Sequence, residues 1–167
     1  MDKLTNQYII TNLIEKFGNA VEVIGEPHEL LTIATSGEQI IDLLSYLKNE
    51  ESLRLNFLTD ITGVHYPGQQ QAFAVVYHLH NLFQNVRVRI KVFLEEENLA
   101  IPTATTLWSG ANWMERETYD FYGIIFVGHP DLRRILNMDE LEVFPMRKEY
   151  PLEDPNRVDK KDFYFGR

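Results

Sequence analysis

The stretch VRVRIKVFL, residues 86–94, constrains the fold of this chain more than any other feature. Apolar side chains stand at every even position, whereas Arg87, Arg89 and Lys91 stand at three of the odd ones. Successive side chains of a β-strand point to opposite faces of the sheet. The alternation therefore predicts a strand with one buried and one polar face, and the chain must form a sheet with one face covered.

Other stretches predict further strands. Apolar residues alternate over residues 53–61 and 73–79, and the sequence HYPGQ between them is typical of a turn. Residues 21–25 and 30–35 are short apolar stretches around Pro27, and we expect two short strands there. Strands in succession favour a mostly antiparallel sheet.

Three helices are expected beside this sheet. Residues 4–17 carry an apolar stripe at helical spacing and are followed by Gly18. Ser36 is a candidate N-cap for a second helix that ends near residue 49, and Asn112 is one for a third. Gly123 is expected to end the third helix.

These elements predict an α+β fold, with a mostly antiparallel sheet and helices packed on one of its faces. We expect this domain to span residues 1–123. Residues 124–167 are expected to form an extended irregular C-terminal segment that binds a partner.

The basic residues of the 86–94 strand have two interpretations. They can be a solvated face that also protects a sheet edge from aggregation, or they can form a docking surface. The solvated face is the favoured interpretation, because polar residues on an open sheet face need no special cause.

Composition excludes several kinds of site. The chain has no cysteine, so it has no disulfide, no thiolate nucleophile and no cysteine-ligated iron–sulfur cluster. Its net charge of -9 argues against nucleic acid as a partner. Half of its 16 Lys and Arg residues stand in residues 130–167, where they nearly balance the acidic residues. A segment of balanced charge suits contacts with proteins.

Sequence motifs point to no active site of its own. The chain has no G-x-G-x-x-G or P-loop phosphate motif and no G-x-S-x-G nucleophile motif. We also expect no signal peptide and no transmembrane helix, because apolar stretches of the required kind are missing.

One alternative is a metal site. His78 and His80 stand two positions apart on a predicted strand, and His65 on the neighbouring strand could add a third ligand. The favoured interpretation is that they are polar residues near the end of a hairpin. A cluster of Glu115, Glu117 and Asp120 is instead interpreted as a salt-bridged helix, in which Arg116 and Asp120 can pair.

Residues 144–152 have the pattern of a binding segment. Pro145 and Pro151 forbid a helix, so we expect an extended chain in which alternate side chains share a face. That face would be largely apolar and consist of Phe144, Met146, Lys148, Tyr150 and Leu152. No strand partner within the chain is evident, so the segment could fold back on its own sheet or lie along another subunit. Arg and aromatic residues are enriched at interfaces, so the second position is favoured.

The same region resembles a known family. ERETYDFYGIIF, GHPDLRRIL and FPMRKEYPLE are similar to the signature of the 30 kDa (C) subunit of NADH:quinone oxidoreductase, respiratory complex I. The resemblance implies a non-catalytic scaffold subunit of the hydrophilic arm of a proton-translocating enzyme. It also implies a peripheral location on the cytoplasmic side of the bacterial inner membrane, reached only through the complex.

The resemblance further implies partners and cofactors. The chain would pack against the quinone-site (D) subunit and neighbouring iron–sulfur subunits, and would hold no cofactor. FMN and iron–sulfur clusters would belong to the partner subunits. The residues expected to bind partners, from the signature and from the apolar face, are Glu115, Arg116, Glu117, Asp120, His129, Asp131, Arg133, Arg134, Phe144, Met146, Arg147, Lys148, Tyr150 and Leu152.

Two alternatives to this function stay open. The chain could be the equivalent subunit of a related membrane-bound hydrogenase or ferredoxin-linked complex. It could instead be a small metalloenzyme that uses His65, His78 and His80.

Among the signature residues, we expect Arg133, Arg134, Arg147 and Lys148 to form charge-assisted hydrogen bonds with carboxylates or carbonyls of a partner.

Overall fold

The computed structural model describes residues 3–150 and has a five-stranded central sheet. Its strands are β1 (Val21–Gly25), β2 (Leu31–Thr35), β3 (Phe57–His65), β4 (Phe73–Asn81) and β5 (Val86–Leu94), in the spatial order β1-β2-β5-β4-β3. Neighbouring strands are antiparallel except for β2 and β5, which are parallel. The predicted α+β class with a mostly antiparallel sheet is confirmed.

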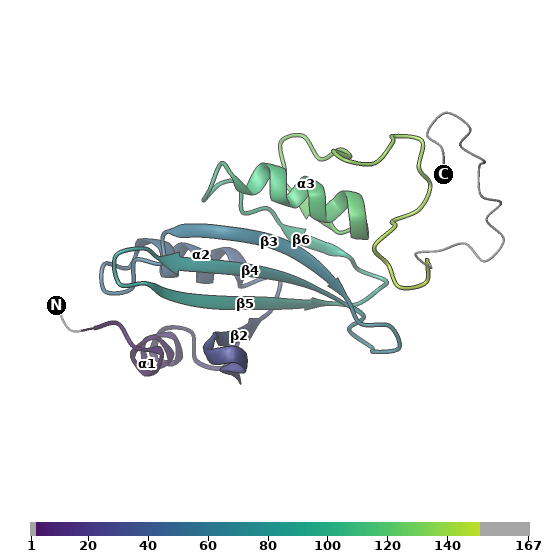
Figure 1. Cartoon of the computed structure of the whole chain (residues 1–167). Helices are drawn as coiled ribbons and strands as arrows, with labels where there is room; N and C mark the ends of the chain where they lie inside the picture. Colours follow the sequence, from purple (N-terminus) through teal and green to yellow (C-terminus); the bar gives the residue numbers. More distant parts are fainter. Residues whose placement is uncertain (1–2, 151–167) are drawn as a thin grey trace, which may run out of the picture.

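Three α-helices accompany the sheet in the described residues: α1 (Asn6–Phe17), α2 (Ile40–Asn49) and α3 (Ala111–Tyr122). Short 3₁₀ turns follow α1 (Gly18–Ala20) and precede β2 (Pro27–Glu29), and β6 (Ala100–Pro102) and β7 (Ile125–Val127) form a small parallel pair. In Figure 1, α2 lies behind β3, β4 and β5, while α3 lies beyond β3 and α1 at the opposite side of the sheet. No helix in the picture stands in front of β3, β4 and β5.

The core lies between the sheet and the helices. Ile33, Ile90, Tyr77 and Ile61 stand in register across β2, β5, β4 and β3, and each is at most 2% exposed. The apolar stripes of α1 and α2 join the same buried cluster. The alternation over residues 86–94 therefore predicts the bounds of β5 and its buried face correctly.

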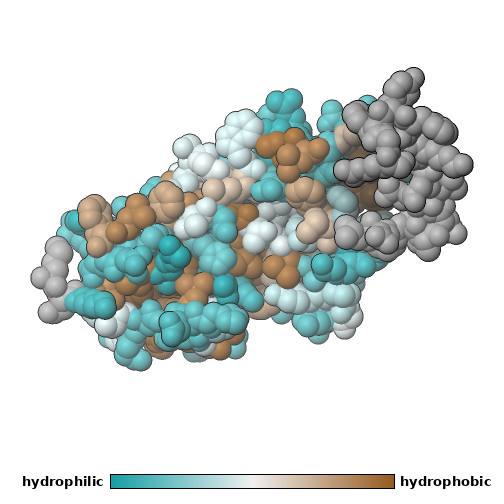
Figure 2. Space-filling model, in the orientation of Figure 1, coloured by the Kyte–Doolittle hydropathy of each residue, from teal (hydrophilic) through white to brown (hydrophobic). Residues whose placement is uncertain are grey.

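The opposite face of the sheet is polar, and we call it the open face. Asp60, His78 and Arg89 form one row across β3, β4 and β5, and Thr62, Val76 and Lys91 form the next. Figure 2 shows hydrophilic residues mixed with apolar ones over these strands, and apolar residues near α3 and the segment after it.

Two predicted helix caps are wrong. The amide of Gln39 donates to the carbonyl of Ser36 at 3.2 Å, so a turn separates Ser36 from α2, which begins at Ile40. Asn112 lies inside α3, whose N-cap is Gly110. A candidate cap is indistinguishable in sequence from a polar residue in the preceding turn or in the first helical turn.

The predicted strand over residues 53–61 is also displaced. Leu53 and Leu55 are buried but precede β3, which begins at Phe57. An irregularity between Leu58 and Asp60 shifts the register, so Leu58 is buried while Phe57 is 46% exposed. Such a bulge breaks the period-two pattern on which the prediction rested.

The chain after β7 is irregular, as predicted, but residues 144–150 are not extended. The amide of Arg147 donates to the carbonyl of Phe144, and that of Tyr150 donates to the carbonyl of Arg147, each at 3.1 Å. These consecutive turns remove the predicted shared face of alternate side chains. Leu152 lies outside the described residues.

Candidate partner-binding segment

Residues 128–150, which we call the C-terminal segment, are anchored on α3 by Asp120. The Oδ2 atom of this carboxylate accepts hydrogen bonds of 2.8–3.1 Å from the backbone N–H groups of residues 135–137. Its Oδ1 atom accepts from Nη1 of Arg134 at 2.8 Å and from Nδ2 of Asn137 at 3.1 Å. Asp120 itself is 0% exposed, so a buried charge binds five donors from one stretch of chain.

These donors determine the ionisation of Asp120. Burial alone would raise its pKa, but the hydrogen bonds from the amides of Asn137, Leu136 and Ile135 and from Arg134 outweigh that effect. They hold the pKa of Asp120 well below its ordinary value. The carboxylate is therefore charged at neutral pH and keeps its hold on the C-terminal segment.

An aromatic ring between two arginines forms the second anchor. The guanidinium groups of Arg134 and Arg147 each lie 5.0 Å from the centroid of the Phe144 ring. Arg147 also lies 5.0 Å from the Phe73 ring of β4 and donates from Nε to the carbonyl of Tyr122 at 2.8 Å. Cation–π contacts of this kind stabilise by about 0.5–2 kcal/mol each.

Gly123 makes this packing possible. It ends α3 in the left-handed conformation, with φ 78°, as the sequence predicts. A Cβ atom at this position would lie 2.6 Å from the Phe144 ring and 2.8 Å from the Arg147 guanidinium. The position therefore needs glycine both for its backbone and for the close approach of the C-terminal segment.

The first turns of α3 bind the beginning of the C-terminal segment. Buried Arg116 donates to the carbonyls of Arg133 and Arg134 at 3.2 and 3.0 Å, and stacks on the Trp113 ring at 5.2 Å. His129 bonds the carbonyl of Asn112 through Nε2 at 3.1 Å. The whole length of α3 therefore holds the C-terminal segment.

Glu115, a residue of α3, has a fully buried side chain. Its Oε2 accepts from the Thr103 hydroxyl and its Oε1 from the Ala104 amide, both at 2.6 Å. Burial raises the pKa of Glu115 to about 7, against the lowering effect of these two hydrogen bonds. Burial and then the nearby Glu115 carboxyl also raise the pKa of Tyr77.

The predicted partner-binding residues thus divide into two groups. One group is held within the chain and consists of Glu115, Arg116, Asp120, His129, Arg134, Phe144 and Arg147. The other group has exposed side chains and consists of Glu117, Asp131, Arg133, Met146, Lys148 and Tyr150.

Two finer expectations need correction. Arg116 and Asp120 do not pair, because Arg116 binds carbonyls of the C-terminal segment and Asp120 binds Arg134 and three amides. Arg134 and Arg147 use their guanidinium groups on carbonyls of their own chain, although a partner was expected to accept from them. Of the four arginines expected at a partner, only Arg133 has an exposed guanidinium, in a surface ion pair with Asp131 at 2.9 Å.

Several residues of this region had no signal in the sequence. The imidazole of His65 accepts the Lys148 amide at 2.9 Å and stacks on Phe73 with ring centroids 4.4 Å apart. Trp113 on α3 and Leu136 and Met138 in the C-terminal segment are 60–69% exposed. No local sequence pattern shows that these apolar side chains face outward.

The histidines do not converge. His65 is in register with Phe73 on the helix-covered face, whereas His78 stands opposite Asp60 on the open face. The metalloenzyme interpretation that combined His65, His78 and His80 is therefore wrong. Residues 3–150 contain no group of three or more His, Asp or Glu side chains placed to hold a metal ion.

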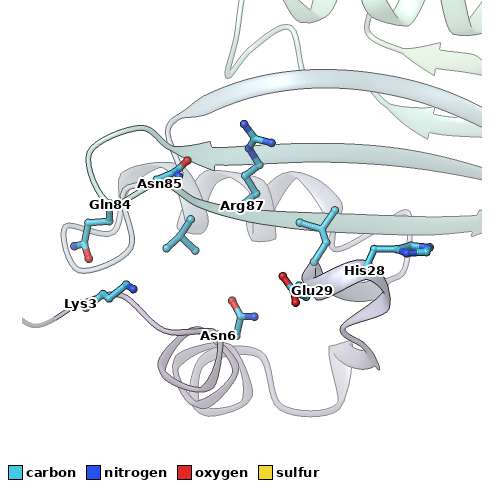
Figure 3. Close-up of a pocket in the computed structure, with 9 residues that line it drawn as sticks. Lys3, Asn6, His28, Glu29, Gln84, Asn85 and Arg87 are labelled. Atoms are coloured by element: carbon cyan, nitrogen blue, oxygen red, sulfur yellow. The ribbon is translucent and has the colours of Figure 1, made fainter.

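A cavity of about 620 Å³ lies elsewhere, between the start of α1, the turn before β2 and the hairpin that joins β4 to β5. Its lining includes Lys3, Asn6, Glu29 and Arg87. Figure 3 shows the guanidinium of Arg87 directed away from Asn6 and Glu29, so the charged groups do not converge on one point. We see no catalytic arrangement among the residues that line this cavity. In the described part of the chain, no helix is both long and apolar enough to cross a bilayer.

Comparison with known proteins identifies relatives over most of the chain. Residues 33–156 match the family model of the respiratory-chain NADH dehydrogenase 30 kDa subunit. The C subunit of NADH-quinone oxidoreductase from Citrifermentans bemidjiense is 43% identical over 152 residues, which cover 91% of this chain and 93% of that protein. The C 2 subunit of the same enzyme from Rhizobium meliloti is 47% identical over 144 residues, covering 86% of this chain and 78% of that protein.

Solved structures agree with these matches. A trypsin-resistant fragment of Nqo5 is 32% identical with a TM-score of 0.64, covering 77% of this chain and all of the fragment. A chain in the membrane-bound sulfane sulfur reductase, an archaeal respiratory membrane complex, is 21% identical with a TM-score of 0.73. That similarity covers 93% of this chain and 96% of the other, and it shows the fold alone.

Proposed function

Because this chain belongs to the family of the respiratory-chain NADH dehydrogenase 30 kDa subunit, we propose that it is a non-catalytic scaffold subunit of NADH:quinone oxidoreductase. In this role it packs against the quinone-site (D) subunit in the peripheral arm and supports electron transfer from NADH to quinone. It reaches the cytoplasmic side of the membrane through the complex. FMN and iron–sulfur clusters belong to its partners. For the clusters, this assignment is supported by the lack of cysteine in all 167 residues.

The anchored C-terminal segment is the observation that carries this proposal. A buried carboxylate and three arginines fix residues 131–150 on α3, although this segment adds little to the apolar core. Met138, Met146 and Tyr150 are 39–69% exposed along it. Exposed methionine and aromatic side chains, together with exposed Arg133 of the same segment, give this fixed surface the composition of a protein interface.

Purification through an affinity tag on this chain, followed by mass spectrometry, tests the proposal. We expect the quinone-site subunit and the iron–sulfur and flavin subunits to co-purify. Recovery of hydrogenase-type subunits without a flavin subunit that oxidises NADH would favour the related-complex alternative. Recovery of no respiratory subunit would contradict both.

A pair of variants tests the surface itself. Met146→Asp places a charge on the proposed interface and is expected to reduce co-purification and NADH:quinone reductase activity in membranes severalfold. Ile14→Asp is the matched control, because Ile14 is a similarly exposed residue on α1, with 51% exposure against 44% for Met146. Equal effects of both variants would contradict the assignment of the interface to the C-terminal segment.

A further inference from the structure

The open face of the sheet holds an arginine whose position is fixed by a relay of hydrogen bonds. Nδ1 of His78 lies 2.6 Å from Oδ1 of Asp60, and Nε of Arg89 donates to Nε2 of His78 at 2.9 Å. Since Nε2 accepts, Nδ1 carries the ring proton and donates it to the carboxylate. The relay follows one row of the sheet from β3 through β4 to β5.

The relay uses only the Nε atom of Arg89. Within residues 3–150, the two terminal NH₂ groups of this guanidinium have no hydrogen-bond partner. A guanidinium held by Nε presents these groups as a planar fork, which matches the two oxygens of a carboxylate. A side chain fixed in advance also loses less conformational entropy when it binds.

Two further cations flank Arg89 on β5, and together the three residues form the basic stripe. Arg87 is exposed, and although it contributes to the lining of the cavity, Figure 3 shows its guanidinium directed away from Asn6 and Glu29. The Nζ atom of Lys91 lies 3.4 Å from the hydroxyl of Tyr66. Among the strands of the described chain, the acidic side chains of the same face are Asp60, which is engaged by His78, and Glu22, on the row of Lys91.

We propose that the open face binds a carboxylate-bearing segment of a neighbouring protein in the complex, with Arg89 as the central anchor and Arg87 and Lys91 beside it. The proposal rests on the proposed function, because it assumes that the chain works within a complex. Charge complementarity selects the partner: a short basic stripe on a chain of net charge -9 suits a few carboxylates. An extended polyanion such as a nucleic acid or an anionic membrane would be repelled by the rest of the surface.

Substitution of Arg89 in the assembled complex tests the anchor. We expect Arg89→Ala to reduce the fraction of partner subunits retained through a high-salt wash by about tenfold or more, as truncation of a desolvated charge contact does. Arg89→Lys keeps the charge without the fork and should restore only part of this retention. Lys16→Glu, an exposed charge reversal on α1, is the control and should leave retention unchanged.

Chemical labelling identifies what lies on the face. Carbodiimide joins lysine to a carboxylate in direct contact, so we expect Lys91 in the purified complex to be linked to an Asp or Glu of another protein. Phenylglyoxal should modify Arg89 in the free chain and much less in the complex. Links from Lys91 only to carboxylates of its own chain, with equal modification of Arg89 in both states, would overturn the proposal.

These outcomes separate the two proposals. Normal co-purification with unprotected Arg89 overturns the docking face alone, whereas loss of all respiratory subunits from the wild-type purification contradicts the proposed function itself. The isolated chain should not sediment with phosphatidylglycerol vesicles. Sedimentation that Arg89→Ala abolishes would assign the face to lipid and overturn a protein partner.

Discussion

Two buried carboxyl groups on α3, Glu115 and Asp120, respond to their surroundings in opposite ways. Both are 0% exposed. Glu115 receives two hydrogen bonds and its pKa rises, whereas Asp120 receives five and its pKa falls. Burial therefore outweighs the two hydrogen bonds to Glu115, whereas the five donors outweigh burial at Asp120, which stays charged.

The raised pKa of Glu115 predicts that stability falls as pH rises. The group has a pKa of about 7 in the folded chain and an ordinary value of 4.5, so between these values the folded state holds a proton that the unfolded state releases. Its contribution is complete below pH 4.5 and is lost as pH rises through 7, a change on the order of 3 kcal/mol. Urea unfolding of the isolated chain between pH 4.5 and 8 measures it.

Glu115→Gln should flatten this pH dependence, because the amide stays neutral and can still bind the Ala104 amide and Thr103 hydroxyl. Glu117→Gln is the matched control, since Glu117 is exposed on the same helix. An unchanged pH slope in Glu115→Gln would show that another group is responsible.

Asp120→Asn should destabilise the isolated chain by about 3 kcal/mol, because an amide cannot accept from all five donors and leaves buried N–H groups unpaired. The folded pKa of Asp120 is lowered, so its contribution is present above the ordinary carboxyl pKa and is lost as pH falls below it. The variant should therefore also lose less stability than the wild type on acidification, as followed by urea unfolding. Asp131→Asn removes an exposed ion pair and should change stability by about 0–1 kcal/mol. Equal effects of the two substitutions would contradict the anchoring role of Asp120.

Among the elements, the junction between α3 and the C-terminal segment depends on Gly123. Gly123→Ala should destabilise the chain, because alanine is strained at positive φ and its Cβ would collide with Phe144 and Arg147. Gly68→Ala measures the cost of backbone strain alone, since Gly68 has φ 81° and nothing within 4 Å of the added Cβ. Urea unfolding measures the loss of stability in each variant, and the loss in Gly123→Ala should be larger by more than about 1 kcal/mol.

Release of the segment should be visible as well. Gly123→Ala is expected to speed tryptic cleavage after Arg133, Arg134 and Lys148, while Gly68→Ala should not. Cleavage at the same rate in both variants would mean that Phe144 and Arg147 adjust without releasing the segment.

The sequence predicts elements well where a local period is intact and poorly where distant residues decide. The alternation of residues 86–94 identifies β5 and its two faces, and Gly123 identifies the end of α3. Asp120 and Glu115, by contrast, have the spacing of a solvated helix face. Their partners lie 11–17 positions away in loops whose shape no local pattern encodes.

The turns of residues 144–150 could not be predicted for the same reason. Pro145 restricts its neighbours to non-helical conformations, but the close approach of Phe144 to Gly123 and of Arg147 to Phe73 selects turns over an extended chain. Tertiary contacts also explain why arginines expected at a partner bind carbonyls of their own chain.

For the whole molecule, the division into residues 1–123 and 124–167 remains a prediction with a direct test. The pair of β6 and β7 extends the first unit to residue 127, and the buried cluster draws most of its members from residues before that point. We expect a chain that ends at Gly128 to keep its secondary structure by circular dichroism. Its melting temperature should fall, because Phe73 and His65 lose the cover of Arg147 and Lys148.

Loss of cooperative unfolding in this shortened chain would show that residues 129–150 belong to the same folding unit as the sheet. A chain that ends at Tyr150 is the control, because it keeps every anchor described here, and its melting temperature should exceed that of the chain that ends at Gly128.

The parallel pairing of β2 with β5 has a consequence for how the protein is made. Leu31 of β2 pairs with Val88 of β5. During synthesis, the edge of β2 that does not face β1 therefore stays unpaired until β5 has been made. At ordinary rates of synthesis this delay is on the order of several seconds. During that time Leu31 and Ile33, which are fully buried in the finished sheet, belong to a nascent chain with an open, apolar edge. Until β5 leaves the ribosome, this unpaired edge can template pairing with another chain, which is a route to aggregation.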